Sequence, residues 1–160
     1  MLLKLKLVLS VVLLSISGFA IAASKSTELE SEVLESFQSL VSASKNLDAE
    51  SYFEHFDADK FVGLNSDGTN WNSMDELVPL IKFGFNSIRE VTSLEFTNVK
   101  VSVIDDYTAI LVNEFSQSMV LVNGDTINVS GGGTQVWSKR NGRWKLVSVS
   151  ASNKPSASTP

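Results

Sequence analysis

Residues 136–152 read VWSKRNGRWKLVSVSAS and predict the last hairpin of the fold. Asn141-Gly142 suits a two-residue type I′ turn, because both central residues of that turn need positive φ angles. A regular hairpin pairs residues that mirror one another about the turn, and directly opposed residues share a face. The expected pairs on one face are Trp137 with Leu146, Gln135 with Ser148 and Gly133 with Ser150.

The face expected to carry this set mixes an aromatic ring with small polar side chains. The opposite face carries small apolar residues, so both faces are expected to be partly covered. Hydroxyls and an amide are tolerated where a face borders a pocket that holds water or ligand. The alternative is that Ser148 and Ser150 face solvent, as on many half-exposed strands. The pocket interpretation assigns the lining to Trp71, Asn113, Gln135, Trp137, Ser148 and Ser150, although core or rim filling is the favoured role of Trp71.

The rest of the chain predicts three helices followed by long strands. Apolar residues at helical spacing indicate a helix from Leu29 to about Lys45, with shorter helices near 48–56 and 73–88. A short strand is expected at 61–64. Stretches rich in β-branched and aromatic residues predict antiparallel strands at 91–104, 107–122, 126–139 and 143–152. Helices followed by a meander make an α+β fold.

The first 22 residues predict a signal peptide. Lys4 and Lys6 precede the apolar run from Leu7 to Ile16, and Ala20-Ile21-Ala22 supplies small residues for cleavage. An uncleaved anchor is the alternative, but the run is short for a membrane span. The protein is therefore expected to be exported, periplasmic or secreted, without a stable membrane anchor after cleavage. The domain is expected at 23–152, followed by a disordered Ser/Pro-rich tail at 153–160.

Charge and cysteine usage exclude several classes of partner and chemistry. Without Lys4 and Lys6, 11 basic and 18 acidic residues remain, a net charge of −7. Nucleic acid is not an expected partner, because its phosphates demand a basic face. The chain contains no cysteine, which excludes thiol catalysis and thiolate metal sites. No metal site and no cofactor are predicted.

The order of elements, together with the quoted hairpin, resembles the SnoaL-like branch of the nuclear-transport-factor-2-like superfamily. The resemblance covers about Leu29 to Ser152 and is most specific in the final hairpin. It implies a cystatin-like, cone-shaped half-barrel, in which three N-terminal helices pack on a strongly curved, four- to six-stranded, mainly antiparallel sheet. The implied cone is open at one end and holds a pocket.

The catalytic groups of some relatives are missing at the matched positions. Many relatives carry an inward-pointing histidine where this chain has Ser150. Steroid-isomerase relatives place a carboxylate base on the first strand and a tyrosine on the first helix, and these places fall near Leu64 and Leu40. Because this fold hosts many activities, the resemblance does not settle the function.

Three titratable residues are weak catalytic candidates. His55 is the single histidine, and a packing or surface role is favoured for it. Asp59 follows Asp57 at the end of the second helix, in a stretch expected to be a solvated loop. Glu114 and Asn113 lie in mid-strand among apolar residues, so one of them should point inward. An inward carboxylate would have a raised pKa and could act as an acid or base.

These observations support three hypotheses. The leading one is an exported protein that holds a small, largely apolar molecule in the cone, as a homodimer packed through the sheet. The second is an isomerase- or dehydratase-type enzyme that uses Glu114 or Asp59 as general base. The third is a dimerising interaction module, which requires an exposed apolar patch on the convex face of the sheet. Whether the protein is an enzyme stays open.

Overall fold

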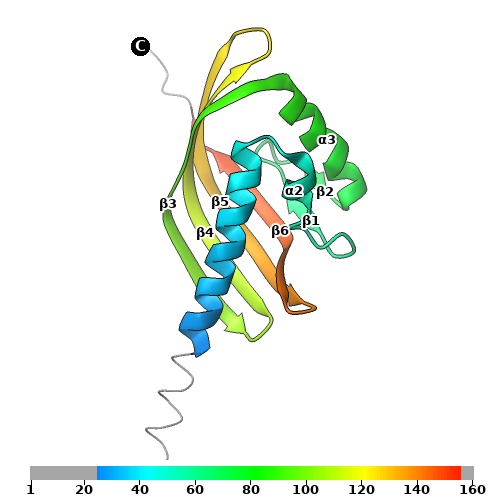
Figure 1. Cartoon of the computed structure of the whole chain (residues 1–160), viewed down its shortest axis with the longest axis vertical. Coiled ribbons are helices and arrows are strands. Elements are labelled where there is room, and N and C mark those ends of the chain that lie inside the picture. Colours follow the sequence, from blue (N-terminus) through cyan, green and yellow to red (C-terminus); the bar gives the residue numbers. More distant parts are fainter. Residues whose placement is uncertain (1–24, 156–160) are drawn as a thin grey trace, which may run out of the picture.

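The computed structural model describes residues 25–155. The expected signal peptide and the end of the expected tail, residues 156–160, lie outside the described residues. The described helices are a long one covering 25–45, α2 (Ala49–Phe53) and α3 (Met74–Ser87). The strands are β1 (Val62–Leu64), β2 (Asn70–Trp71), β3 (Ile88–Asp105), β4 (Thr108–Leu121), β5 (Thr126–Arg140) and β6 (Arg143–Asn153) (Figure 1).

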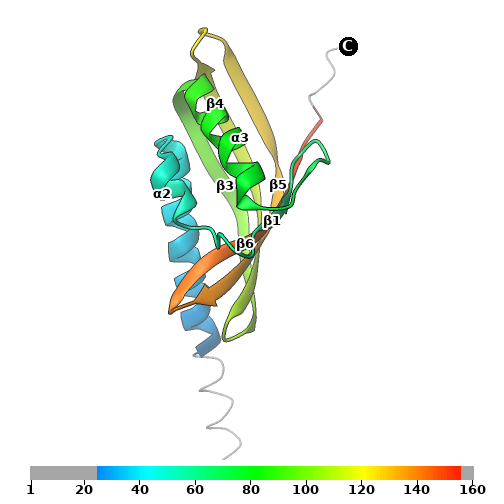
Figure 2. The ribbon, with the colours of Figure 1, turned by 90° about the vertical axis from the view of Figure 1, so that its right-hand side faces the viewer.

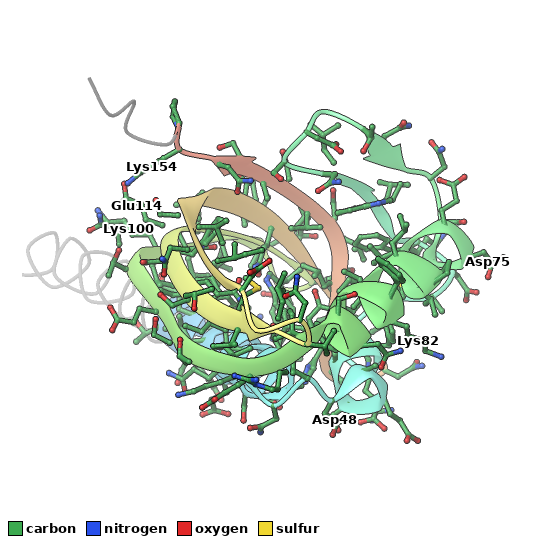
Figure 3. All side chains as sticks on the ribbon, turned by 90° about the horizontal axis from the view of Figure 1, so that it is seen from above. Asp48, Asp75, Lys82, Lys100, Glu114 and Lys154 are labelled. Atoms are coloured by element: carbon green, nitrogen blue, oxygen red, sulfur yellow. The ribbon has the colours of Figure 1, made fainter. Side chains whose placement is uncertain are left out.

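The strands form one curved, open sheet in the order β2-β1-β6-β5-β4-β3 (Figure 3). Strands β3 to β6 are an antiparallel meander, as expected from the sequence. The short strand β1 lies parallel to β6 and antiparallel to β2. The α+β fold class with a mainly antiparallel sheet is therefore confirmed.

The helices cover one face of the sheet, which we call the inner face (Figure 2). The 25–45 helix buries the apolar stripe that its spacing predicts, with Val33 and Phe37 at its centre. This stripe packs on Ala109, Leu111 and Trp137, which are fully buried. Burying a large apolar side chain stabilises the fold by about 1.5–3 kcal/mol, so the stripe holds helix and sheet together.

The segment after α2 is hydrogen-bonded to the last hairpin. Asp48 caps α2, because its Oδ1 accepts a hydrogen bond from the Ser51 amide at 3.1 Å. The Leu146 amide donates to the His55 carbonyl oxygen at 2.7 Å, and the Asp57 amide donates to the Leu146 carbonyl oxygen at 3.0 Å. These two bonds fix His55 beside the start of β6.

The hairpin turn has the conformation that its sequence predicts. Asn141 and Gly142 have φ angles of 49° and 76°. Directly after the turn, Lys139 lies opposite Trp144, and Trp137 lies opposite Leu146, as expected. The type I′ turn therefore sets the pairing of the first few residues on each side.

Beyond Leu146 the predicted pairing is wrong. Val136 lies opposite Ser148, Gln135 opposite Val149, and Thr134 opposite Ser150, so Val147 is an extra residue in β6. Such a β-bulge places two residues of one strand against one of its partner. Because a shift of one residue exchanges the faces of a strand, every later side chain of β6 changes sides.

The bulge moves Ser148 and Ser150 to the outer face of the sheet. There they lie beside Val62 and Leu64 of β1, and Ser150 is exposed. The expectation that both serines share a face with Gln135 is therefore corrected. Their place on the inner face is taken by Val149 and Ala151, which are opposite Gln135 and Gly133.

The assignment of β6 side chains to the inner and outer faces can be tested by introducing one aspartate on each face. We expect Val149→Asp to lower the free energy of unfolding by about 2 kcal/mol or more, because it places a carboxylate among apolar side chains. Ser152→Asp, on the exposed outer side, should change it by about 0.5 kcal/mol or less. Urea denaturation of both variants measures the difference. Equal effects, or a larger effect at residue 152, would contradict the register.

Candidate functional site

A partly open cavity of about 200 Å³ lies between the inner face of strands β3 to β6 and the C-terminal end of the 25–45 helix. Half of its lining residues are aliphatic or aromatic, and one more is glycine. The polar lining consists of one hydroxyl and three amides, and no lining side chain is ionisable. The lining residues are Ser44, Leu94, Phe96, Asn113, Phe115, Gln117, Gly133, Gln135, Val149 and Ala151.

Two predicted pocket residues, Asn113 and Gln135, lie in this lining and are only 7% and 8% exposed. The Oε1 of Gln135 accepts a hydrogen bond from the Trp137 indole nitrogen at 3.0 Å. Trp137 is not itself a lining residue, but this bond positions the amide that is. The Oδ1 of Asn113 is buried and accepts no hydrogen bond from any described residue.

Strand β4 presents Asn113 to the cavity and turns Glu114 to the outer face. The sequence left open which of the two points inward. The Oε2 of Glu114 accepts a hydrogen bond from Asn98 at 3.0 Å, and its Oε1 lies 3.6 Å from the Lys154 ammonium. Figure 3 shows Glu114 close to Lys100 and Lys154 at the outer edge of the sheet. Glu114 is therefore outside the cavity.

Gly131 allows an aromatic wall to form beside the amides. A Cβ at this position would overlap the Ser152 carbonyl oxygen and would lie 2.9 Å from the Phe115 ring. Only glycine leaves room for this approach of β6 and the ring. Phe115 faces Phe96 across the β3–β4 pair, with ring centroids 6.5 Å apart.

A neighbouring apolar hollow of about 290 Å³ lies between the 25–45 helix and β3. Leu94 and Phe96 line both this hollow and the amide cavity. Phe96 also packs edge-on against Phe37 of the helix, with ring centroids 5.1 Å apart. Leu94 and Phe96 therefore form the wall between the hollow and the amide cavity.

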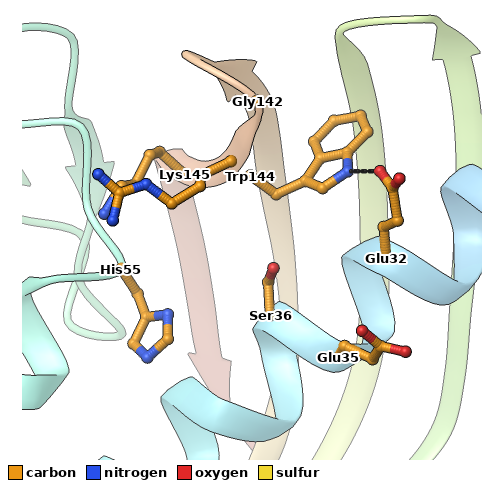
Figure 4. Close-up of a pocket in the computed structure, with 8 residues that line it drawn as sticks. Glu32, Glu35, Ser36, His55, Gly142, Trp144 and Lys145 are labelled. Carbon is orange, nitrogen blue, oxygen red and sulfur yellow. Dashed lines mark hydrogen bonds between the residues drawn. The ribbon is translucent and has the colours of Figure 1, made fainter.

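A polar hollow of about 320 Å³ lies on another part of the molecule, between the 25–45 helix and the β5–β6 hairpin (Figure 4). Glu32 of the helix accepts hydrogen bonds from Lys139 Nζ at 2.6 Å and Trp144 Nε1 at 2.8 Å. These two bonds lower the pKa of the Glu32 carboxyl. They also tie the helix to the hairpin.

His55 lines this polar hollow and not the amide cavity. Burial lowers its pKa below the ordinary value of 6.5, the nearby Lys145 lowers it further, and Glu54 opposes them. Lys145 donates a hydrogen bond to the Glu54 carbonyl oxygen. Burial, followed by the charge of Arg143, lowers the pKa of Lys145 as well. His55 is therefore neutral at pH 7.

Asp59 lies in a further surface hollow of about 310 Å³, beside the hairpin turn. It is exposed, and its amide donates to Asp57 Oδ1 at 3.1 Å. Asp57 itself lies 3.6 Å from the Arg140 guanidinium. The structure thus brings Asp59 and His55 to neighbouring hollows that both contain Lys145, and neither residue reaches the amide cavity.

The remaining residues that were expected to line the pocket lie outside the amide cavity. Trp71 packs against the hydrophobic core beside Gly63 and is not among the cavity-lining residues. Ser148 and Ser150 are on the outer face because of the bulge. Sequence reasoning missed Ser44, Leu94, Phe96, Phe115, Gln117, Val149 and Ala151. Strand alternation from Asn113 was sufficient to find Phe115 and Gln117, whereas Val149 and Ala151 require knowledge of the bulge.

Residues 25–155 contain neither a candidate metal-ion cluster nor a candidate membrane-spanning helix. No group of three or more histidine, aspartate or glutamate side chains in this part of the chain could hold a metal ion. No helix within the same residues is long and apolar enough to cross a membrane.

Comparison with known families identifies the fold. The SnoaL-like domain family matches residues 33–156. The chain belongs to this family. No curated protein matches its sequence.

Several solved structures are similar to this SnoaL-like protein. A candidate aromatic ring hydroxylase from Novosphingobium aromaticivorans has a TM-score of 0.72 at 15% identity, over 81% of this chain and 92% of its own. A candidate dehydratase of the NTF2-like family from Streptomyces avermitilis has a TM-score of 0.69 at 16% identity, over 79% and 96%. The association domain of C. elegans CaMKII has a TM-score of 0.66 at 21% identity, over 79% and 97%. At these identities the likeness shows the fold alone.

The charge environment of His55 can be measured directly, because it is the single histidine of the chain. We expect its imidazole to titrate below pH 6.5 by NMR. Lys145→Gln should raise this pKa, and Glu54→Gln should lower it. Because the folded pKa is below the unfolded one, stability falls as the pH drops below about 6.5. Lys82→Gln, on the exposed side of α3, should leave the titration unchanged, and a pKa above 6.5 would contradict the described environment.

Proposed function

We propose that this SnoaL-like protein binds a small, uncharged, largely apolar molecule in the 200 Å³ cavity. The observation that carries the proposal is the lining itself, which combines apolar walls with a few amides and has no ionisable side chain. Such a combination is typical of small-molecule sites. The names of two structural relatives, a candidate aromatic ring hydroxylase and a candidate dehydratase, are consistent with a small-molecule cavity in this fold. Export is a separate proposal that rests on residues 1–22 of the sequence alone.

Binding is favoured over general acid–base catalysis because of where the carboxylates lie. A general base must come within hydrogen-bond reach of the proton it removes. Glu114 is on the outer face, and Asp59 is exposed beside the hairpin turn. Neither is in position to act on a molecule held in the cavity. The amides of Asn113, Gln117 and Gln135 can orient a ligand through hydrogen bonds, but they do not ionise near neutral pH and so cannot act as a general acid or base.

The volume of the cavity limits the ligand. A buried apolar cavity of about 150 Å³ is large enough to hold benzene. The cavity of about 200 Å³ therefore suits a compact molecule of roughly six to ten non-hydrogen atoms. A longer molecule would extend through the open side of the cavity, or would displace Leu94 and Phe96 and enter the neighbouring hollow between helix and β3.

The proposal is tested by replacing a small residue of the cavity wall with a large one that fills the cavity. A thermal-shift screen of uncharged small molecules should give ligands that raise the melting temperature, and the shift should grow with the logarithm of the ligand concentration above Kd. Ala151→Phe places a ring in the cavity and should remove these shifts, whereas Ser152→Phe, on the outer side, should keep them. The proposal would be contradicted if no compound raised the melting temperature, or if the compounds stabilised Ala151→Phe as much as the wild-type protein.

The outer face of the sheet favours a second candidate function, self-association. One row across neighbouring strands contains Val62, Ser148, Val136, Ile110 and Ser102, and the next contains Leu64, Ser150, Thr134, Val112 and Lys100. Lys100, at the edge of the sheet, is the one charged residue in these two rows. Val62 is 50% and Val112 42% exposed, so the face presents apolar surface to solvent. An association domain among the structural relatives is consistent with this use of the fold.

We therefore expect a homodimer packed through the outer face, as the leading sequence hypothesis requires. Light scattering should give twice the mass of the chain at micromolar concentration. Val112→Asp should produce a folded monomer, because it places two like charges in the self-complementary interface. Phe83→Asp, on the exposed surface of α3, is the matched control and should leave the dimer intact. A wild-type monomer would contradict this interface.

A further inference from the structure

One buried acceptor in the cavity wall has no hydrogen-bond donor within the part of the chain that the structure describes. The Oδ1 of Asn113 has almost no exposed surface and accepts no hydrogen bond from residues 25–155. Buried polar atoms in folded proteins are nearly always hydrogen-bonded, and an unpaired one is destabilising. An atom of this kind in a cavity wall indicates that the donor comes from the molecule the cavity binds.

The cross-strand partner of Asn113 is Gly133, so the neighbouring strand places no side chain against this oxygen. A Cβ at Gly133 would lie 3.6 Å from Asn113 Oδ1, so any longer side chain would occupy the position in front of the amide. Because the oxygen itself has almost no exposed surface, the Asn113 amide has to turn toward the cavity to meet a ligand, and glycine leaves room for that movement. Both residues belong to the lining of the cavity.

A second amide lies on the diagonal from the first. Asn113 pairs with Gly133 and Leu111 pairs with Gln135, so Asn113 and Gln135 are diagonal neighbours on the inner face. Diagonal neighbours have Cα atoms about 7–8 Å apart, which lets a single ligand group contact both side chains. The Oε1 of Gln135 already accepts from Trp137, so its Nε2 is the atom left to donate.

The rest of the lining limits the charge of the ligand. A charged group would be desolvated without an opposite charge to compensate it, since none of the lining residues is ionisable. The rings of Phe96 and Phe115 offer apolar contact for the body of the molecule. A hydroxyl is the simplest uncharged group that can donate to one amide and accept from the other.

We propose that the cavity selects an uncharged hydroxyl compound, whose O–H donates to Asn113 Oδ1 and whose oxygen accepts from Gln135. Its apolar body lies against Phe96 and Phe115. This inference rests on the proposed function, and it adds the chemical class of the ligand. It also accounts for a polar side chain between Leu111 and Phe115 on the inner face of β4.

Three probes of equal size test the inference on the wild-type protein. p-Cresol carries a hydroxyl, anisole carries an oxygen that only accepts, and p-xylene has no polar group. Isothermal titration calorimetry should show p-cresol binding about tenfold or more tightly than the other two, because only it satisfies the buried acceptor. The side-chain NMR signals of Asn113 should shift with p-cresol and stay in place with p-xylene.

Asn113→Leu has nearly the same shape without the acceptor, and it should bind the three probes with similar affinity. Asn86→Leu, on the exposed surface of α3, should keep the wild-type preference. Equal wild-type affinities for p-cresol and p-xylene would overturn the hydroxyl inference while leaving small-molecule binding intact. Absence of binding by all three probes would overturn the proposed function and the inference together. The comparison of probes on the wild type does not depend on the folding of any variant.

Discussion

The extra residue Val147 in β6 is the constraint on which the inner surface of the sheet depends. Before it, Trp144 and Leu146 point into the core. A regular strand would continue with Ser148 and Ser150 on that side and would place two hydroxyls beneath the helices. The bulge exchanges them for Val149 and Ala151. One inserted residue thus makes the end of β6 suitable both for packing and for lining a cavity, and the serines are left on the outer face.

The two polar regions of the molecule have different chemistry because different elements build them. Around the β5–β6 turn, Glu32, Lys139 and Trp144 form a bonded group in which every charge is close to solvent or to an opposite charge. The amide cavity lies further along the same strands, where the walls are apolar and the polar groups are neutral. Ionisable groups therefore hold the helix to the hairpin, while neutral groups face the cavity.

The sequence predicts the elements of this fold better than the facing of their side chains. Helical spacing identifies the 25–45 helix, and turn residues separate the four long strands correctly. The site is only partly predictable: Asn113 and Gln135 are found as polar residues in apolar strands, but Ser148 and Ser150 are placed on the wrong face. The apolar positions switch from even to odd numbers after Leu146, but the same pattern also fits a regular strand whose two faces are both partly covered, and Val147 is as good a strand residue as its neighbours. The parallel pairing of β1 with β6 was not expected either, since it joins segments about 85 residues apart in the chain.

The hydrogen bond between Trp137 and Gln135 makes the fluorescence of a core tryptophan sensitive to the state of the cavity wall. The emission of an indole depends on the polarity around its N–H group, and here that group touches an amide in the cavity wall. Trp71 and Trp144 lie on β2 and at the start of β6, away from the lining. Fluorescence from a chain that keeps Trp137 and replaces the other two tryptophans by phenylalanine would therefore act as a built-in reporter of cavity occupancy, without any attached dye.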